Sequence, residues 1–544
     1  MAEPLAKMIH SKPTGLEPVP SLEIGAMEIV ENNVTEAQGH QAEMPRSFSR
    51  LSSIAVGFGY DRIPLCELGL THHSITNSWI AYLSSFAISL SYGGRPVVIF
   101  GCLIATFVQG FITLGLSEIA SAFPSSGGQY HFVWVLAPLK TRRFAAFVIG
   151  WMTLLGWWII ACSGATLSAV SIIGMVSFWY PDLVLHSWQT WLVYVGVVCM
   201  TAAPVVLFPK AVPRIAQFVL TMSIVGFVIC FTIVLAMKKQ VVPGSTVTKL
   251  NQGTSGWPDG LGWFLGICNA LFAYVGTDSP IHIAEEMHRP GRQIPEAMNT
   301  TILIGFLTTM PLMVAMMYTV ADTDAVVNSA LPSLEAFYQI TGSKGVSTFM
   351  LAWTTVIYTV CVVPQWVTCG RMAWAFSRDN GLPFSDYFKH LHPKTKVPVR
   401  ATVLSVVFCW IYGLLFIASS AAFNSIITSA VLYLNITYVV PQAILLARGR
   451  STLPNRTLNL GKLGLFCNVF SQIAVVCILV FTCFPSFDPV QISSMNWSSV
   501  VLVGLFGLII VLFFVTGRNF QGPEIDMALI SAANQQERDL RKRK

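Results

Sequence analysis

The stretch from Gly262 to Ala297, GWFLGICNALFAYVGTDSPIHIAEEMHRPGRQIPEA, decides how the rest of the chain is interpreted. It begins as an apolar run long enough to enter a bilayer, and then places the residues GTDSP, 276–280, where a spanning helix is most hydrophobic. An Asp at the centre of such a helix costs about 2.5–3.5 kcal/mol on insertion scales, so Asp278 indicates a functional site. The flanking Gly and Pro predict a helix that stops and restarts, which a membrane tolerates only where the freed backbone lines a cavity. Broken helices of this kind bind the substrate in secondary transporters.

The composition places the whole chain in a bilayer. Of its 544 residues 54% are hydrophobic and only 11% are charged, whereas soluble proteins carry about 25% charged residues. Apolar runs of spanning length recur from Leu65 to Thr516, which predicts a polytopic, all-α membrane protein. The net charge of +7 does not indicate nucleic acid, because the basic residues lie between apolar runs. We expect a lipid bilayer and a small-molecule substrate as partners, and no obligate protein partner.

Twelve transmembrane helices are expected. They cover about 65–92, 97–121, 143–178, 189–208, 212–237, 261–285, 295–320, 346–376, 400–419, 423–446, 463–484 and 498–516. An even number of spans puts both termini on one side. The flanking segments 1–50 and 518–544 are polar and are predicted to be tails, which leaves 51–517 as the transporter domain.

The distribution of Lys and Arg predicts which side the termini face. Sixteen of these residues lie in loops on the side of the termini, within 140–143, 210–214, 289–292, 378–400 and 448–462. Five lie in loops on the other side: Arg95, Lys238, Lys239, Lys249 and Lys344. The positive-inside rule therefore predicts cytoplasmic termini. The expected location is the plasma membrane, and an internal membrane stays open.

The first span contains a second polar interruption, the run HHSITNS at residues 72–78. Ser, Thr and Asn compete for backbone hydrogen bonds and favour helix ends, so we interpret this run as another break. A continuous helix with a polar face is the alternative. Breaks in spans one and six fit two inverted repeats of five spans, about 65–237 and 261–446, followed by two further spans within 463–516. Half-helix amino ends can bind a carboxylate, whereas free carbonyls, Asp278 and aromatic faces can bind an ammonium group.

Four motifs in order resemble the amino acid, polyamine and organocation (APC) transporter superfamily. They are SITNSW at 74–79, LSEIASAFPSSGGQYHFVWVLAP at 116–138, AYVGTDSPIHIAEEMHRPGRQIPEAM at 273–298, and GRMAWAFSRDNGLPFSDYF at 370–388 followed by PVRA at 398–401. The resemblance covers about residues 49–518. It is greatest to the fungal branch of amino acid, choline and 4-aminobutyrate permeases.

This resemblance implies a LeuT-type fold with alternating access and a substrate between the unwound parts of spans one and six. Carried onto matching positions, the substrate-binding residues are Thr76, Asn77, Ser78, Gly276, Thr277, Asp278 and Ser279. Many superfamily members have a Gly-x-Gly turn in span one, which the run ITNSW replaces here. The fungal relatives also suggest proton coupling, so H⁺ is the expected coupling ion and no cofactor is expected.

Further candidates follow from residue chemistry. Tryptophans that could line the site or present a cation–π face are Trp79, Trp157, Trp158, Trp353 and Trp366. Groups that could carry the proton are Asp278, His282, Glu118 and Glu285. A cytoplasmic gate is predicted at Glu285, Glu286, Arg289 and Arg292, with Arg142, Arg143, Arg378 and Asp379 near it. The twelve cysteines occur singly without a C-x-x-C pair, which favours buried small side chains over a metal site.

The expected function is secondary active transport of an amino acid or a related small amine. A choline, 4-aminobutyrate or polyamine permease of the same fold is the alternative. An enzyme is not expected, because the chain has no H-E-x-x-H, G-x-S-x-G or Walker motif. A transporter-like nutrient receptor is less favoured, because such receptors tend to carry longer cytoplasmic extensions.

Overall fold

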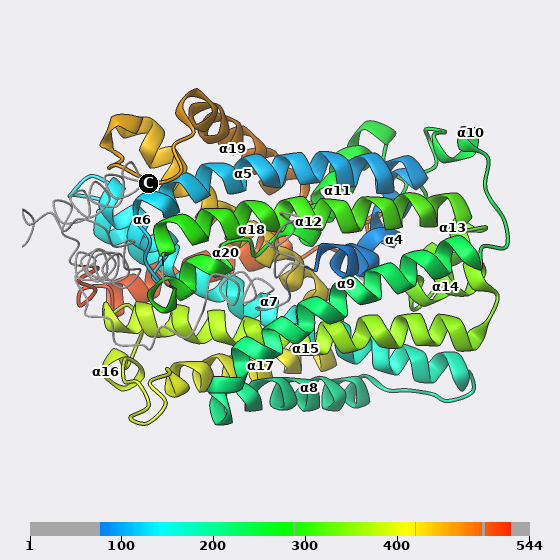
Figure 1. Cartoon of the computed structure of the whole chain (residues 1–544), viewed down its shortest axis with the longest axis horizontal. Helices are drawn as coiled ribbons and strands as arrows, with labels where there is room; N and C mark the ends of the chain where they lie inside the picture. Colours follow the sequence, from blue (N-terminus) through cyan, green and yellow to red (C-terminus); the bar gives the residue numbers. More distant parts are fainter. Residues whose placement is uncertain (1–76, 288, 419, 492–494, 524–544) are drawn as a thin grey trace, which may run out of the picture. The chain divides into compact units, whose positions relative to one another are not determined.

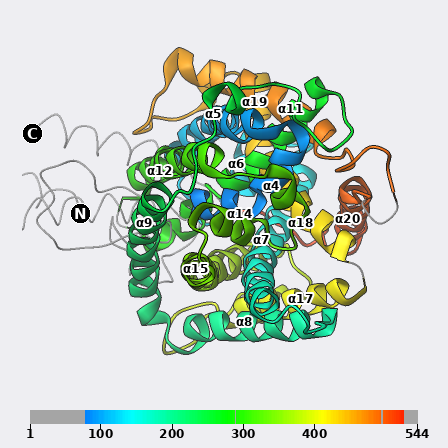
Figure 2. The ribbon, with the colours of Figure 1, turned by 90° about the vertical axis from the view of Figure 1, so that its right-hand side faces the viewer.

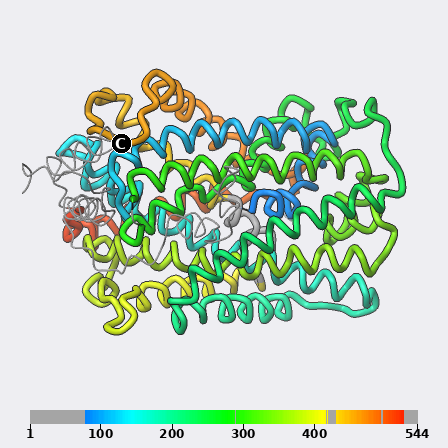
Figure 3. The backbone as a smooth tube through the Cα atoms, in the orientation of Figure 1, coloured from blue at the N-terminus to red at the C-terminus, as the bar shows by residue number. Residues whose placement is uncertain are grey.

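The computed structural model describes residues 77–287, 289–418, 420–491 and 495–523. The predicted tail 1–50, residues 65–76 of the first predicted span with most of its predicted break, and residues 524–544 of the predicted C-terminal tail lie outside these residues. Long helices follow one another along a common direction and are joined by short helical connections at their ends (Figures 1 and 3). Within the described ranges the secondary structure is helical, as the composition predicted.

The helices agree closely with the predicted spans. The long ones are α4 (Ser78–Pro96), α5 (Cys102–Ala122), α7 (Arg142–Trp179), α8 (Ser187–Leu207), α9 (Val212–Ala236), α11 (Asp259–Ala270), α12 (Pro290–Thr319), α15 (Lys344–Arg378), α17 (Val399–Ala418), α18 (Ser420–Arg448), α19 (Gly461–Phe481) and α20 (Ser498–Val515). Ten described segments are long and apolar enough to cross a membrane. One of them, Ser78–Ala122, holds two predicted spans, and Val399–Leu415 is a shorter apolar helix.

The first of these segments changes direction at Gly93 and Gly94, where the backbone angles are not helical. A π-helical turn, η2 (Val97–Gly101), then leads into α5. Arg95 is only 4% exposed and donates to the carbonyls of Met317 (2.6 Å) and Val320 (3.0 Å). The turn after α4 is thereby fixed to the C-terminal end of α12, where carbonyls lack helical partners and a cation is favoured.

Span six is interrupted where the sequence predicted. After α11 the chain forms one turn of 3₁₀ helix, η4 (Leu271–Tyr274), becomes extended at Val275, and resumes as η5 (Ser279–Glu286) before α12. Gly276 lies in the break with a φ of 87°, a conformation that glycine adopts without steric cost. This positive φ turns the backbone between the two half-helices.

Burial separates the interior helices from those on the periphery. In the end-on view of Figure 2, α4 and α7 lie inside, and α8, α9 and α20 lie at the edge. The most apolar windows of α8, α9 and α20 are 33%, 28% and 11% buried, as expected for surfaces that face lipid. Trp79, Trp157, Trp366 and Trp374 are among the largest fully buried side chains.

The sequence analysis did not predict the short helices between the spans. These are α6 (Gln129–Leu136), η3 (Pro209–Ala211), α10 (Gly244–Val247), α13 (Thr323–Asn328), α14 (Pro332–Thr341), α16 (Ser385–Phe388) and η6 (Arg450–Thr452). Each is too short to span a bilayer, so hydropathy does not detect it. Helix α6 matters most for function, because its first residues reach the break in span six.

Candidate functional site

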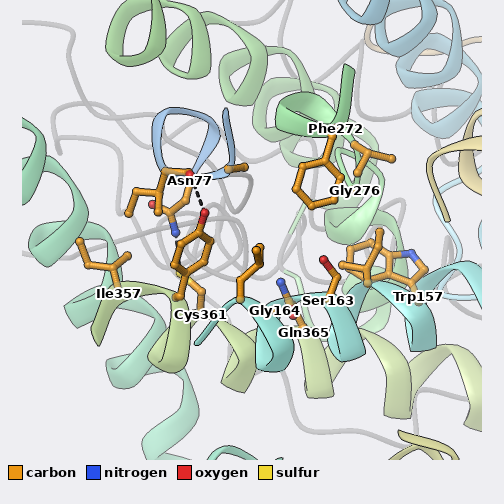
Figure 4. Close-up of a pocket in the computed structure, with 15 residues that line it drawn as sticks. Asn77, Trp157, Ser163, Gly164, Phe272, Gly276, Ile357, Cys361 and Gln365 are labelled. Carbon is orange, nitrogen blue, oxygen red and sulfur yellow. Dashed lines mark hydrogen bonds between the residues drawn. The ribbon is translucent and has the colours of Figure 1, made fainter. Parts of the chain in front are cut away.

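A cavity of about 70 Å³ lies between α4, α7, the break in span six and α15 (Figure 4). This is several times the volume that one water molecule requires. Span six contributes Phe272 and Gly276, and α7 contributes Trp157. None of the fifteen described residues that line the cavity carries a formal charge. A solute held here would contact neutral polar groups, helix ends and aromatic rings.

Three aromatic residues from three elements form part of the wall: Trp157, Phe272 and Tyr358. The Tyr358 hydroxyl donates to the carbonyl of Ile80 at 2.5 Å, which fixes this residue of α15 to the first turn of α4. The Trp157 indole donates to Asp278 Oδ2 at 3.2 Å. Two of the three aromatic side chains are therefore held in place by hydrogen bonds at their polar ends.

Asn77 marks the amino end of α4 at the cavity. Its backbone is left-handed, with a φ of 35°, and its carbonyl accepts from the amides of Ile80 (2.9 Å) and Ala81 (3.0 Å). Its side chain is bound to the surrounding helices, because Nδ2 donates to Cys361 Sγ at 2.5 Å and Oδ1 accepts from Ser223. The positive end of the α4 dipole therefore lies at the cavity.

Asp278 lies behind the wall of the cavity and is fully buried. Its Oδ2 accepts from Gln129 Nε2 at 2.6 Å and from Trp157 Nε1 at 3.2 Å, and its Oδ1 accepts from the Tyr438 hydroxyl at 2.6 Å. The Tyr438 oxygen in turn accepts from the amide of Gly276 at 3.2 Å. This carboxylate therefore binds donors from α6, α7 and α18, and it contacts the unwound backbone through Tyr438.

His282, one turn after Asp278, also contacts this carboxylate. Its Nε2 is 3.2 Å from Asp278 Oδ2, and its Nδ1 is 3.1 Å from the carbonyl of Ser126. Each ring nitrogen of His282 therefore faces an acceptor, the Ser126 carbonyl at Nδ1 and the Asp278 carboxylate at Nε2.

The segment between α5 and α6 is shaped to fit this histidine. Gly128 has a φ of 65°, and a Cβ on it would lie 2.8 Å from His282 Cε1. Ser126 contributes both its carbonyl, to His282, and its hydroxyl, which accepts from the amide of Glu285 at 3.2 Å. The SSGGQ sequence at 125–129 therefore packs directly against η5.

Two buried ion pairs join η5 to α15. Glu285 pairs with Arg378 at 2.9 Å, and Glu286 pairs with Arg371 at 2.7 Å. Close by, Asp379 accepts from Tyr130 (3.0 Å) and contacts His131 (2.8 Å). Burial, followed by the charge of Asp379, raises the pKa of Tyr130 well above its usual value, so this tyrosine stays a neutral donor.

Glu118 forms a separate ionic cluster. Its carboxylate binds Arg450 and Arg456, each at 2.6 Å. Arg450 also donates to Asn468 at 2.5 Å, and Asn468 donates to Gln442 at 3.0 Å. Gln442 donates to the carbonyl of Tyr438, one turn before it on α18. A chain of hydrogen bonds thus connects this cluster with the tyrosine that binds Asp278.

Five of the seven predicted substrate residues fall into two groups. Asn77 and Gly276 line the cavity. Asp278, Thr277 and Ser279 lie behind it; Thr277 contacts Thr113 (3.1 Å) and Ser279 contacts Thr368 (3.0 Å). Ser78 is buried at the start of α4 but is not part of the lining, and Thr76 lies outside the described residues. The binding roles of all seven residues stay predictions.

Of the predicted tryptophans, only Trp157 lines the cavity. The others bond elsewhere: Trp79 to Ser223 (3.0 Å), Trp158 to Ser405 (2.6 Å), Trp353 to the carbonyl of Met222 (3.2 Å) and Trp366 to Thr201 (3.0 Å).

Among the predicted gate residues, Glu285 and Glu286 pair with arginines of α15. Arg292 pairs with Glu296 on its own helix at 2.6 Å, and Arg289 is exposed at the start of α12. Of the residues expected nearby, Arg378 does join the pairs. Arg143 donates to the carbonyl of Gly517 (2.9 Å), and Arg142 lies over the Trp134 ring. The gating role stays a prediction.

The sequence analysis missed several residues of the site, namely Phe272, Tyr358, Gln365, Gln129 and Tyr438. A single polar side chain within an otherwise apolar span, such as Gln365 in VVPQWV, could have indicated an inward-facing position. Sequence alone gives no comparable signal for the aromatic residues, because most aromatics in a span pack against other helices or lipid.

An all-helical bundle with a broken span beside an internal cavity has the architecture of a secondary transporter. The amino acid permease family model matches residues 71–522, so the chain belongs to the amino acid permease family. It is a multi-pass membrane transporter of the permease class rather than an enzyme.

Curated relatives in fungi match almost the whole chain. A choline transporter of Saccharomyces cerevisiae is 30% identical over 89% of this chain and 83% of its own length. A swainsonine transporter of Arthroderma benhamiae is 27% identical over 87% of this chain and 92% of its own. A 7-keto 8-aminopelargonic acid transporter of S. cerevisiae is 26% identical, covering 88% and 95%.

We predict that Tyr438→Phe destabilises the protein more than Tyr433→Phe does. The first change removes a donor to the buried Asp278 carboxylate, a bond to a charged group worth about 1.5–3 kcal/mol. Tyr433, on the same helix, donates only to the carbonyl of Val501, a neutral bond worth about 0.5–1.5 kcal/mol. Thermal unfolding of the purified proteins in detergent measures the difference. Equal midpoints for the two variants would show that Tyr438 is not needed to hold the carboxylate.

We also predict that neutralising Arg371 or Glu286 alone destabilises the folded protein more than neutralising both. Breaking a buried pair leaves an uncompensated charge, at a cost of about 3–5 kcal/mol, whereas removing both partners costs less. A double-mutant cycle with Arg371→Gln and Glu286→Gln, followed by thermal unfolding, gives the coupling energy. Arg292→Gln with Glu296→Gln is the control, because that pair is 40% and 27% exposed and should couple weakly. Additive effects at Arg371 and Glu286 would refute the prediction.

Proposed function

We propose that this permease transports a small solute with an ammonium group, and that the cavity between α4, α7, the break in span six and α15 binds that group. The observation that carries the proposal is a cavity at the junction of two half-helices whose described lining residues carry no charge and include three aromatic side chains. A cation over an aromatic ring gains about 0.5–2 kcal/mol, and more when it is desolvated. Such a wall binds an ammonium group without a carboxylate.

The helix end in span six supports the same assignment. The last carbonyls of a helix lack partners and carry partial negative charge. The end of η4 and the turn at Gly276 put this negative end beside Phe272 and Trp157. The name of the S. cerevisiae choline transporter makes choline the first solute to test on this chain.

An amino acid is the second candidate, and one observation favours it. The amino end of α4 lies at the cavity through Asn77, and helix amino ends bind carboxylates. A zwitterion would then have its ammonium group at the rings and its carboxylate at α4. Choline and zwitterions therefore share the aromatic wall and differ in their need for the α4 end.

We further propose that His282 carries the coupling proton. With the proton present, the imidazolium donates to Asp278 and to Ser126. Once the proton leaves Nε2, the lone pair of this nitrogen faces the carboxylate. The hydrogen bond between His282 of η5 and Asp278 is then lost. Since Asp278 also binds Trp157 of the cavity wall, the state of the proton reaches the solute site.

In the proposed orientation both termini are cytoplasmic and the protein lies in the plasma membrane. The support is the excess of Lys and Arg in loops on the side of the termini. The ion pairs of Glu285 and Glu286 with α15 then lie on the cytoplasmic side of the cavity. They are proposed to close that side in the present conformation.

Uptake assays test the solute. In a fungal strain that lacks its own permeases, we expect the chain to take up labelled choline, with 4-aminobutyrate and alanine as zwitterionic comparisons. Phe272→Leu should raise the KM about 3- to 10-fold through loss of a cation–π contact. Phe264→Leu is the control, because Phe264 lies on α11 with 48% exposure and stacks on Phe481. The proposal fails if none of these ammonium solutes is taken up, or if Phe272→Leu leaves the KM unchanged.

Proteoliposomes with a clamped membrane potential test the proton. We expect an acidic outside to accelerate uptake by the wild type, because the proton enters with the solute. His282→Gln should abolish this acceleration and keep solute exchange, and His186→Gln, at an exposed position, should behave like the wild type. Acid acceleration that persists in His282→Gln would assign the proton to another group.

A further inference from the structure

A second cavity, of about 360 Å³, lies at the end of α7. Its wall is formed by the last turns of α7, the first turn of α8 and the residues within 329–335 that lead from α13 into α14. Small-molecule sites in proteins usually have volumes of about 300–1,000 Å³. The second cavity is therefore large enough to admit a small organic solute.

The second cavity lies at the end of the bundle opposite to the buried ion pairs. Figure 1 shows α13 and α14 at one end of the long helices, and α6 and α16 at the other. Helix α15 begins at Lys344, whose ammonium group lies 5.2 Å from the centre of the Phe178 ring in the wall of the second cavity. The same helix ends at Arg378, which pairs with Glu285. In the proposed orientation the second cavity is therefore on the external side.

One face of α7 connects the two cavities. Trp157, Gly164 and Leu167 line the cavity of Figure 4, which is the proposed solute cavity. Val170 and Gly174 line the second cavity. Successive members of this series are three, four or seven residues apart, and these spacings put side chains on one face of a helix. The step from Leu167 to Val170 is only about 4.5 Å along the helix axis, so less than one turn of α7 separates the two linings.

Glu335 is the one charged residue among the described residues that line the second cavity. Its Oε1 accepts from Gln339 Nε2 at 2.9 Å. Its Oε2 has no hydrogen-bond partner within the described ranges and is accessible to solvent, because the side chain is partly exposed. The rest of the described wall consists of apolar side chains, hydroxyl groups and the Phe178 ring. An accessible carboxylate in an otherwise neutral cavity attracts a cation.

Two neighbouring charges bear on this assignment. Lys344 is exposed and lies over the Phe178 ring, so it opposes the binding of a cation near that ring. Glu335 lies in the first turn of α14, where a negative charge also stabilises the amino end of the helix. Asp324 has the corresponding place in α13 but does not line the cavity. Comparison of the two acids therefore separates an effect on the helix end from an effect on the solute.

Building on the proposed function, we infer that the second cavity is the first binding site of the ammonium solute on its way to the solute cavity, and that Glu335 attracts the solute there. The apolar side chains of the wall contact the methyl and methylene groups of the solute, which then moves along the shared face of α7. Electrostatic attraction of this kind acts mainly on the rate of association, and salt screens it.

Initial rates of labelled choline uptake into the permease-deficient strain test the role of Glu335. The ionic strength is set to about 0.01 M or about 0.15 M, where charges interact over about 30 Å and about 8 Å, and sucrose keeps the osmolarity constant. Glu335→Gln should lower kcat/KM for choline about threefold at the lower ionic strength and less at the higher one. Lys344→Gln should raise kcat/KM, and the matched control Asp324→Asn should behave like the wild type.

A variant that fills the second cavity tests whether the solute passes through it. Ser177 lines the cavity at an exposed position, so Ser177→Trp narrows the space without disturbing the core. We expect this change to lower kcat/KM for choline at both ionic strengths. Ser187→Trp is the control, because Ser187 is an exposed residue at the start of α8 outside the lining.

The outcomes distinguish this inference from the proposed function. If Glu335→Gln and Asp324→Asn give the same kcat/KM at both ionic strengths, or if Ser177→Trp takes up choline like the wild type, the inference is refuted and the ammonium site in the solute cavity stands. A wild type that takes up no ammonium solute overturns both. A salt-dependent loss in Glu335→Gln, with the opposite change in Lys344→Gln, supports both. If Glu335→Gln does not reach the membrane, Lys344→Gln and Ser177→Trp still test the inference.

Discussion

One buried carboxylate holds the centre of this permease together. Asp278 accepts hydrogen bonds from Gln129, Trp157 and Tyr438 and contacts His282, so it joins α6, α7, α18 and η5. An ionised carboxylate inside a bilayer is costly unless its oxygens are fully bonded. Each of these elements must therefore keep its place for the carboxylate to remain fully bonded. The carboxylate holds Trp157 of the cavity wall in place without lining the cavity itself.

Polar connections extend from this centre in two directions. Through Tyr438 and Gln442 they reach Asn468 on α19 and the cluster of Glu118 with two arginines. Through η5 they reach the ion pairs with α15. Each connection consists of hydrogen bonds between buried groups. Such bonds are strong in a medium of low dielectric, and a buried polar group that loses its partner is costly for the same reason. A conformational change that separates these groups must therefore replace several of these hydrogen bonds at the same time.

The sequence predicted the spans and the break in span six because both depend on local composition. A run of about twenty apolar residues needs no knowledge of its neighbours, and a Gly and a Pro around an Asp disrupt a helix wherever it packs. Such local reasoning could not predict which side chains bind Asp278. Its partners come from positions 129, 157 and 438, and whether a carboxylate faces a cavity or other side chains depends on how distant helices are rotated. The pairing of Glu286 with Arg371 was unpredictable for the same reason.

The absence of charge from the described lining of the cavity has a consequence for energetics. If the lining contributes no ionised group of its own, the loaded cavity carries the charge of its solute and the empty cavity carries none, so the membrane potential acts on the step that moves the loaded cavity. A monovalent cation then responds to the membrane potential directly, at about 2.3 kcal/mol per 100 mV. That is equivalent to roughly 50-fold accumulation. A neutral wall would therefore put the voltage dependence of transport in the loaded step of the cycle and leave the return of the empty cavity insensitive to the potential.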